Sequence, residues 1–591
     1  MKLLKEWIVV NRNGYFSSST VSQAHTRSYH GLYVTSEGDQ TRNVLLSKMW
    51  ESIMVEGREY NIDTNYFGDV VHPEGYRYIF EYEDYPVPLF KYRMGEIIIE
   101  KEILWDPNQN VLYIKYAFPE KIPDQFSVNP LLAFRKAGSM NTDTNGISIS
   151  RNNESLSFQK GGMKLSVNNA NYFVENGIIY RNFTYSEERE RGYGYREDLF
   201  SPGSFIFKGE REIIFKFYQE GEKAEFQKSK NAFIKFTSPT FKDSEIPERM
   251  QGISNFFITG ENIIAGYHWF GAWSRDALIS IPGLLLVRGR FDDAKKILSR
   301  FMKIYPDGKI RNYEGGDINP ADSPLLFVYA LKKYMDYSND LPFIRSSINY
   351  VDTIMNNYID GFDGIKMEDA LISVPPGTTW MDARCDGTFI TPRNGKPVEI
   401  NALWFNALSS MKEFYFKLNI KPPESYDDVI AKVRTKFMEK FVEGNRIKDV
   451  ADPDDPSVRP NMLFAFSLPY PVMSNIRPFL EGFKELVTPY GIRTLSPSDR
   501  NFVSVYEGDQ CSRDRAYHNG TIWPWLIGPY ITSTVRSGIR KDYLRNYFKD
   551  LMNRNYIPEI FDGFIPDDPK GCIIQAWSYA ELIRAYIEDL R

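Results

Sequence analysis

The hydrophobic period changes once along this chain, near residue 240, and that change limits the folds it can adopt. Upstream of it, short runs alternate apolar and polar residues and are separated by turn-forming segments; examples are residues 31–36, 76–83, 96–105, 110–118 and 213–220. A period of two predicts strands, and strands at this spacing are typical of an antiparallel sandwich. Because this part shows no helical period, we expect an N-terminal β-sandwich over residues 1–240.

From residue 245 to 591, apolar residues recur at helical spacing. Leu341, Ile344, Ile348, Val351 and Met355 form one such stripe, stepping by three and four residues. We count twelve candidate helices between residues 246 and 589. Hairpin pairs of this kind predict an (α/α)6 toroid. Some of the connections are long for a compact domain, and such loops are usually functional; they are residues 306–320, 361–397, 488–518 and 555–572.

Charge and hydropathy exclude several partners. The 591 residues carry 72 Lys and Arg against 77 Asp and Glu, a net charge of −5 at pH 7, whereas nucleic acids and anionic membranes favour basic surfaces. The longest charge-free, mostly apolar run that we identify, Ile279–Val287, is far short of the about 20 residues that cross a membrane. Lys5 and Glu6 interrupt the N-terminal apolar stretch, so it does not resemble a signal peptide.

The cysteines are Cys385, Cys511 and Cys572. Their odd number and the absence of a CxxC spacing argue against a disulfide framework and a structural zinc site, so we expect a cytoplasmic protein. We interpret Cys385 and Cys511 as packing residues. The acidic run at residues 451–456 is interpreted as turns, not as a calcium site, and we expect no metal and no cofactor.

Tryptophans and carboxylates gather in the long loops of the helical half. Carboxylates and arginines can bond the hydroxyls of a saccharide, and flat aromatic rings can cover its C–H faces. One such segment is equally well explained as aromatic packing, but several together favour a saccharide site. The segments are residues 266–280, 377–404, 506–525 and 557–578.

These segments resemble the amylo-α-1,6-glucosidase module of glycogen debranching enzymes in their archaeal and bacterial single-chain form. The resemblance covers nearly the whole chain. It rests on residues 13–34, with Thr26-Arg27 before Tyr29-His30-Gly31, and on successive blocks WFGAWSRD, TWMDA, TPRNGKPVEINALW, RPNMLFAFSLP, GIRTLSPSD, YHNGTIWPW and QAWS. It implies an (α/α)6 catalytic domain over residues 245–591, preceded by a β-sandwich. It also implies hydrolysis of α-1,6-linked glucosyl branches in glycogen or limit dextrins, with a branched α-glucan as partner.

The resemblance implies an inverting mechanism, in which a general acid and a general base lie about 6.5–9.5 Å apart. Our candidate acid is Asp382, whose neighbours Trp380 and Met381 could raise its pKa. A loop-capping carboxylate is the alternative.

The candidate base is Glu559, which follows the stiff backbone of Pro558. Its position ahead of the QAWS block is where the family has its second carboxylate. Glu507 is the main competitor for this role, and Asp509 is a weaker one.

The remaining candidates are expected to hold the glucosyl unit. Arg275 and Asp276 resemble the Trp-x-Arg-Asp element that binds the terminal sugar in related toroidal glucosidases, although they could instead be an ion pair at a helix end. The others could be structural as well, by core packing or, for Glu399, by capping a helix; they are Trp269, Trp273, Trp380, Arg393, Glu399, Glu507, His518 and Trp523.

We find no glucanotransferase module, because the first 240 residues are too few and lack the βα alternation of a barrel. Another toroidal α-glucosidase, of glucoamylase or trehalase type, is the nearest alternative. A non-catalytic glucan-binding protein is disfavoured, since binding alone does not require two separated loop carboxylates.

Overall fold

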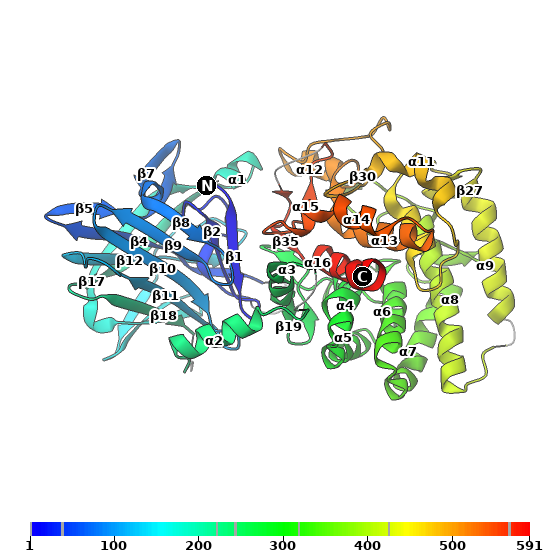
Figure 1. The fold of residues 1–591 in the computed structure, drawn as a ribbon, viewed down its shortest axis with the longest axis horizontal. Helices are drawn as coiled ribbons and strands as arrows, with labels where there is room; N and C mark the ends of the chain where they lie inside the picture. The colour runs from blue at the N-terminus through cyan, green and yellow to red at the C-terminus, as the bar shows by residue number, and fades with distance from the viewer. Residues whose placement is uncertain are drawn as a thin grey trace. The chain divides into compact units, whose positions relative to one another are not determined.

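The computed structural model describes residues 3–36, 41–219, 223–241, 245–316, 319–423, 426–564 and 569–591. The chain divides into two compact units, each described by itself (Figure 1). The first comprises Met1–Pro239 and Gln251–Thr259, and the second comprises Thr240–Met250 and Gly260–Arg591.

Two eight-stranded sheets, counted over the described residues, make up most of the first unit, and their strands pair antiparallel. One sheet has the order β1 (Glu6–Val10), β2 (Phe16–Thr20), β3 (Gly31–Val34), β4 (Asn43–Val55), β12 (Gln125–Lys136), β17 (Arg196–Phe207) and β16 (Phe173–Thr184), with β5 (Arg58–Asn61) beside β4. The other has the order β13 (Ser148–Arg151), β14 (Ser155–Lys160), β15 (Met163–Asn168), β18 (Glu212–Tyr218), β11 (Val111–Ala117), β10 (Ile97–Trp105), β9 (Leu89–Met94) and β8 (Ile79–Glu83). A separate hairpin joins β6 (Thr64–Phe67) to β7 (Val70–Glu74).

The two sheets pack against each other through aromatic side chains. Phe205 of β17 and Phe215 of β18 are fully buried, with ring centroids 5.1 Å apart. Tyr116 of β11 lies 4.9 Å from Phe126 of β12. The alternation of buried and exposed residues therefore gives the sandwich that the period of two predicts.

The first unit also contains helices, which the hydrophobic period did not indicate. Helix α2 (Phe226–Phe236) contacts β10, and its buried side chains Ser229, Phe233 and Phe236 step by four and three residues. A second, shorter helix, α1, spans Ser186–Glu190. The stripe of α2 escapes a search for apolar residues because one of its three buried positions is a serine, which donates a 2.6 Å hydrogen bond to Asp106.

Six helices of the second unit form a closed ring among the described residues. Each contacts the next, and the last contacts the first; they are α4 (Ser274–Leu284), α6 (Ser323–Ser338), α8 (Val398–Leu418), α10 (Phe464–Ser467), α13 (Ile527–Arg536) and α16 (Ala576–Ala585). All residues of α4 and α16 are buried, as expected for helices inside a ring. At their contact, a Cβ on Gly283 would lie 1.8 Å from the backbone oxygen of Ala580, so only glycine allows this approach.

Outer helices alternate with the inner ones along the chain, which gives the paired arrangement of an (α/α)6 toroid. In α7 the predicted stripe residues Ile344, Ile348, Val351 and Met355 are buried, and α7 contacts α6 and α8. Among the described residues, the helices of the second unit outside the ring are α5 (Phe291–Ile304), α7 (Leu341–Asp360), α9 (Tyr426–Phe441), α11 (Leu480–Phe483), α12 (Gln510–Tyr517), α14 (Lys541–Tyr547) and α15 (Lys549–Met552), and α3 (Glu248–Ile253) is shared by the two units.

The segment 488–518, predicted as a loop, contains a helix, α12 (Gln510–Tyr517). Asp509 caps it by accepting a 2.8 Å hydrogen bond from the backbone N–H of Ser512. The helix predicted over residues 519–535 begins later, because Ile522–Trp523 form strand β32. That strand belongs to a small sheet of the order β30 (Val487–Thr488), β31 (Gly491–Arg493), β32, β33 (Ile560–Phe561) and β34 (Pro569–Lys570).

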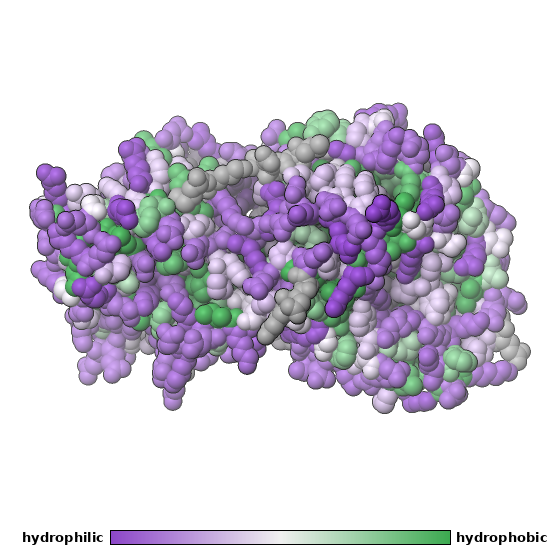
Figure 2. Space-filling model, in the orientation of Figure 1, coloured by the Kyte–Doolittle hydropathy of each residue, from purple (hydrophilic) through white to green (hydrophobic). Residues whose placement is uncertain are grey.

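The other loops of the second unit carry two-stranded pairs: β21 (Gly266–Tyr267) with β35 (Ile574–Gln575), β22 (Lys366–Glu368) with β23 (Leu371–Ser373), β24 (Arg384–Cys385) with β25 (Thr388–Phe389), β26 (Lys396–Pro397) with β29 (Val450–Ala451), and β27 (Val442–Glu443) with β28 (Arg446–Ile447). On the face shown in Figure 2, apolar residues are interspersed among hydrophilic ones. Within the part of the chain that the structure describes, no helix combines the length and apolar character needed to cross a membrane.

Candidate active site

The predicted site residues lie at one end of the helical ring. Inner and outer helices alternate, so the inner helices run in the same direction, and the segments that lead into them meet at the same end. Trp273 caps α4, and Arg275 and Asp276 lie in its first turn. The segments before α8, α13 and α16 bring the remaining candidates, with Asp382 and Glu559 among them.

Arg275 forms an ion pair with the candidate acid, Asp382. Its Nη1 lies 3.4 Å from Oδ2 of Asp382, and its Nε donates a 2.7 Å hydrogen bond to Oδ2 of Asp322, the residue that precedes α6. The Asp382 side chain is 26% exposed, which leaves it accessible. Burial raises the pKa of Asp382, the positive charge of Arg275 opposes that rise, and Asp322 adds to it. A carboxyl group with a raised pKa can keep a proton for donation.

Glu559 is held by two donors. The hydroxyl of Tyr517 donates to Oε1, and the backbone N–H of Cys572 donates to Oε2 over 2.9 Å. The residue is only 2% exposed. Gly571 has φ of +68°, and a Cβ there would lie 2.2 Å from Oε2 of Glu559, so glycine is required beside this carboxylate.

Asp276, the residue after Arg275, faces the segment before α16. It accepts a 3.0 Å hydrogen bond from Nε2 of Gln575. The pKa of Asp276 is raised to about 7, chiefly by burial; Arg275 opposes the rise and the charge of Glu559 contributes to it. In the first turn of α4, Arg275 therefore lies beside Asp382, and Asp276 is joined through Gln575 to Cys572, whose N–H donates to Glu559.

Asp276 should make the stability of the protein depend on pH. Its folded pKa, about 7, exceeds its ordinary value of 3.8, so folding disfavours the charged form, and stability declines as the pH rises from about 4 to about 7. In Asp276→Asn this contribution is absent. We expect the free energy of unfolding of the variant, relative to the unsubstituted protein, to increase from pH 5 to about pH 7 by up to about 1.4 kcal/mol per pH unit, and the difference in melting temperature to increase with it. Melting curves of both proteins at four pH values test this, and a constant difference would contradict it.

Trp380, His518 and Trp523 form a buried aromatic cluster. The Trp380 ring meets His518 and Trp523 edge-on at 5.4 and 5.3 Å, and His518 stacks on Trp523 at 5.7 Å. Burial, with nearby arginines, lowers the pKa of His518 well below its ordinary value, so the imidazole is neutral. The cluster packs the acid loop against the segment before α13; contact of these rings with substrate stays a prediction.

Arg393 and Glu399 belong to a buried network behind the acid loop. Nη2 of Arg393 donates a 2.7 Å hydrogen bond to Oε2 of Glu399, and its Nε donates a 2.6 Å bond to Oδ2 of Asp449. Asn461 donates a 2.8 Å bond to Asp449 and accepts a 2.7 Å bond from Trp380. The guanidinium of Arg393 is bonded to the carboxylates of Glu399 and Asp449, so Arg393 and Glu399 stabilise the loop. Contact of these two residues with substrate stays a prediction.

Trp269 and Trp273 are half-buried and keep accessible surface. The ring centroids of Trp273 and Tyr313 are 5.3 Å apart. Stacking of Trp269 and Trp273 on a sugar ring stays a prediction. Glu507 is exposed, and among the described residues no hydrogen bond or ion pair joins it to the other candidates.

Three residues of the site were not predicted: Asp322, Tyr517 and Gln575. Tyr517 is the first residue of the YHNG block and Gln575 is the first residue of the QAWS block, so the motif blocks could have indicated both as site residues. Asp322 precedes Ser-Pro at the start of α6, which is typical of a helix start and does not indicate a partner for Arg275.

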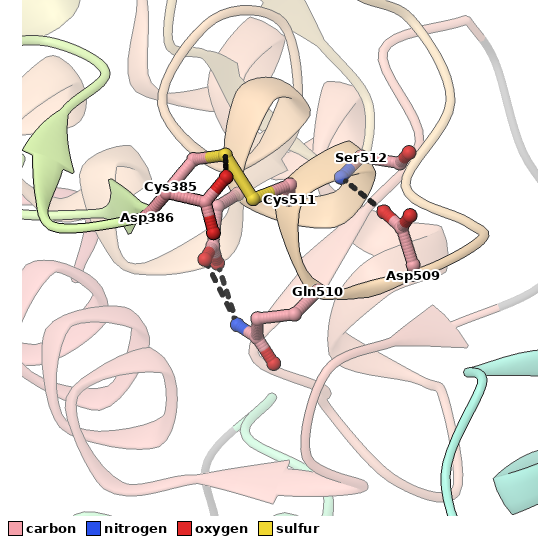
Figure 3. The surroundings of a disulfide bond; sticks show 7 residues. Cys385, Asp386, Asp509, Gln510, Cys511 and Ser512 are labelled. Carbon is pink, nitrogen blue, oxygen red and sulfur yellow. Dashed lines mark hydrogen bonds between the residues drawn. A yellow bond between two sulfur atoms is a disulfide. The ribbon is translucent and has the colours of Figure 1, made fainter.

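The interpretation of Cys385 and Cys511 as packing residues was wrong, because the two form a disulfide (Figure 3). They are 126 residues apart in sequence, and their Cα atoms are 4.9 Å apart. The pairing depends on α12 packing against β24, and α12 was predicted as a loop. Cys572 is buried and unpaired as a cysteine.

The acidic run at residues 451–456 is neutralised by lysines. Asp452 pairs with Lys396 and Lys440, and Asp454 pairs with Lys448, at 2.7–3.0 Å. Residues 452–454 form a turn, as predicted.

Comparison with known proteins identifies the family on both units. The family model described as "Amylo-alpha-1,6-glucosidase" matches residues 242–584, and the model described as "Glycogen debranching enzyme N terminal" matches residues 5–212. A glycogen debranching enzyme of Saccharomyces cerevisiae is 25% identical over an alignment of 405 residues, which covers 49% of this chain and 26% of the yeast protein. The chain thus spans about a quarter of the length of that curated relative.

The fold also matches a solved structure. A bacterial glucoamylase complexed with acarbose superposes with a TM-score of 0.64 at 13% identity, covering 100% of this chain and 92% of the glucoamylase. That enzyme is an (α/α)6 toroid, so the likeness confirms the predicted fold of a β-sandwich followed by a helical toroid. Since the first family model covers more than half of the chain, the protein belongs to the amylo-alpha-1,6-glucosidase family of glycoside hydrolases.

Proposed function

We propose that this protein hydrolyses α-1,6-linked glucosyl branches in glycogen or limit dextrins and releases glucose with inversion. The observation that carries the proposal is that two unlike carboxyl groups are connected to the first turn of α4, Asp382 directly through Arg275 and Glu559 through Cys572 and Gln575 to Asp276. Asp382 is accessible with a raised pKa, and Glu559 is buried and held by two hydrogen-bond donors. Membership of the family supports the choice of an α-1,6-linked glucan.

In this mechanism Asp382 gives its proton to the glycosidic oxygen while the bond to C1 breaks. Glu559 takes a proton from the water that attacks C1 from the opposite face. Two donors, Tyr517 and the Cys572 N–H, orient the Glu559 carboxylate. Nη2 of Arg275 is buried with no hydrogen-bond partner in the described structure, so a hydroxyl of the terminal sugar is its natural acceptor.

A branched α-glucan is the proposed partner. We place the reaction in the cytoplasm because glycogen is stored inside cells; the disulfide removes the argument from cysteine content for a reducing compartment.

The test is proton NMR of a fresh reaction on a dextrin that carries single α-1,6 glucosyl branches. We expect the signal of β-glucose to appear first, before mutarotation equilibrates the anomers. Initial α-glucose would exclude inversion and reopen the assignment of the carboxylates. Release of glucose from maltose or trehalose, with none from the branched dextrin, would instead support another toroidal α-glucosidase.

A further inference from the structure

The disulfide joins the two segments that carry the catalytic carboxylates. Cys385 lies in β24, three residues after Asp382. Cys511 lies in the first turn of α12, and Tyr517, the last residue of that helix, donates its hydroxyl proton to Glu559. A short covalent path therefore connects the loop of the proposed acid to the helix that orients the proposed base (Figure 3).

Few buried contacts hold the two joined segments. In the β24–β25 hairpin, Arg384, Asp386 and Thr388 are exposed. The hairpin is fastened by a 3.0 Å hydrogen bond from the N–H of Ile390 to the carbonyl of Ala383 and by Arg384, which lies 4.1 Å over the Phe389 ring.

Helix α12 also buries few side chains. It spans only eight residues, and its buried side chains are Arg513 and Ala516. Segments with little buried surface open most readily. The disulfide is thus a covalent connection between the acid loop and α12, two segments with little buried side-chain surface.

We propose that the Cys385–Cys511 disulfide is a positioning crosslink, which keeps the loop of Asp382 in register with the helix that supports Glu559, and that its reduction lowers turnover. The inference rests on the proposed function, because it assigns these carboxylates to the reaction. Both cysteines are half-buried, so a small reductant can reach them.

The reduction is a simple exchange with a dithiol such as dithiothreitol. One thiolate of the reagent attacks a protein sulfur, and the second thiolate then closes the reagent into its own cyclic disulfide. The S–S bond of the protein breaks, and each protein sulfur gains one electron and one proton. The two electrons come from the reagent.

The first experiment counts thiols in protein denatured without reductant. One reactive thiol per chain, from Cys572, is expected, and three are expected after reduction. Three thiols before reduction would overturn the inference, because the crosslink would then not exist in solution.

The second experiment measures kcat and KM on the branched dextrin for the oxidised protein, the reduced protein, Cys385→Ser, Cys511→Ser and the double variant. We expect kcat to fall about 10- to 100-fold in all four altered forms, because misplacement of a catalytic group by about 1 Å has effects of this size. Reductant should not affect the double variant, and reoxidation should restore the native protein. The melting temperature should fall by about 5 °C or more, because the crosslink closes a long loop.

A structural role without positioning gives a different result. If kcat and the pH profile are unchanged well below the lowered melting temperature, the inference is wrong. It is also wrong if the serine variants lose activity while reduced native protein does not, since the loss would then come from the substitution.

Hydrogen exchange separates this inference from the proposed function. Reduction should deprotect amides in residues 377–397 and 505–517 even if the oxidised protein releases no glucose from the dextrin, a result that would defeat the proposed function alone. Unchanged exchange in both segments would overturn the crosslink as a positioning device whatever the substrate.

Discussion

Replacing Asp382 by asparagine is expected to lower kcat by about 100- to 10,000-fold, the usual contribution of a positioned general acid. Asparagine keeps the shape of the side chain and can still accept from Arg275, but it has no proton to give to the leaving oxygen. Affinity for the branched dextrin should change little, because substrate binding does not need that proton. Initial rates of glucose release and calorimetric titration with the dextrin measure the two effects separately.

The matched control is Asp386→Asn. Asp386 is exposed, lies four residues further along the same segment and has the same side chain. Its φ of +49° is one that asparagine tolerates, so the substitution should leave kcat within about twofold. Equal losses in both variants would indicate a general effect of the substitution on the loop, and full activity of Asp382→Asn would exclude this residue as the acid.

Glu559→Gln should lower kcat over the same range of about 100- to 10,000-fold, since an amide cannot take a proton from the attacking water. The substitution also disturbs the local hydrogen bonds. Two donors, Tyr517 and the Cys572 N–H, converge on the carboxylate, and an amide NH2 cannot accept from one of them, at a cost of about 1–3 kcal/mol in stability. Loss of the negative charge should lower the pKa of Asp276, whose rise Glu559 reinforces.

Glu507→Gln is the control for the base. Glu507 was the main competitor for this role, and its exposed side chain has no hydrogen bond to the other candidates among the described residues. We expect its kcat to stay within about twofold of the unsubstituted protein. A large loss in Glu507→Gln, with a small one in Glu559→Gln, would move the general base to the loop before α12.

The sequence predicted the features that depend on local pattern. The stripe on α7 indicated a helix and its buried face because a helix repeats every 3.6 residues whatever it packs against. The carboxylates and Arg275 were found through motif blocks, which record residue types at fixed spacing. Helix α2 was missed because a hydrogen-bonded serine occupies a buried position, and a search for apolar residues cannot register it.

The features that were not predicted depend on contacts between distant segments. Arg393 and Glu399 are six residues apart, but their network is completed by Asp449, 56 residues beyond Arg393. The partner of Cys385 is 126 residues away. No spacing rule specifies such pairs, because tertiary packing chooses them. The same holds for Asp322, which the start of α6 presents to Arg275.

Closure of the helical ring has a consequence for how the enzyme comes into being. The first inner helix, α4, supplies Arg275 and Asp276, yet its neighbour in the ring is α16, the last one to be synthesised. The seam between them is so tight that Gly283 lies against the backbone of Ala580. Gln575, just before α16, completes the hydrogen bonding of Asp276. A growing chain therefore holds Arg275 and Asp276 long before Gln575 is made, and the surroundings of both residues are complete only when the final inner helix docks against the first.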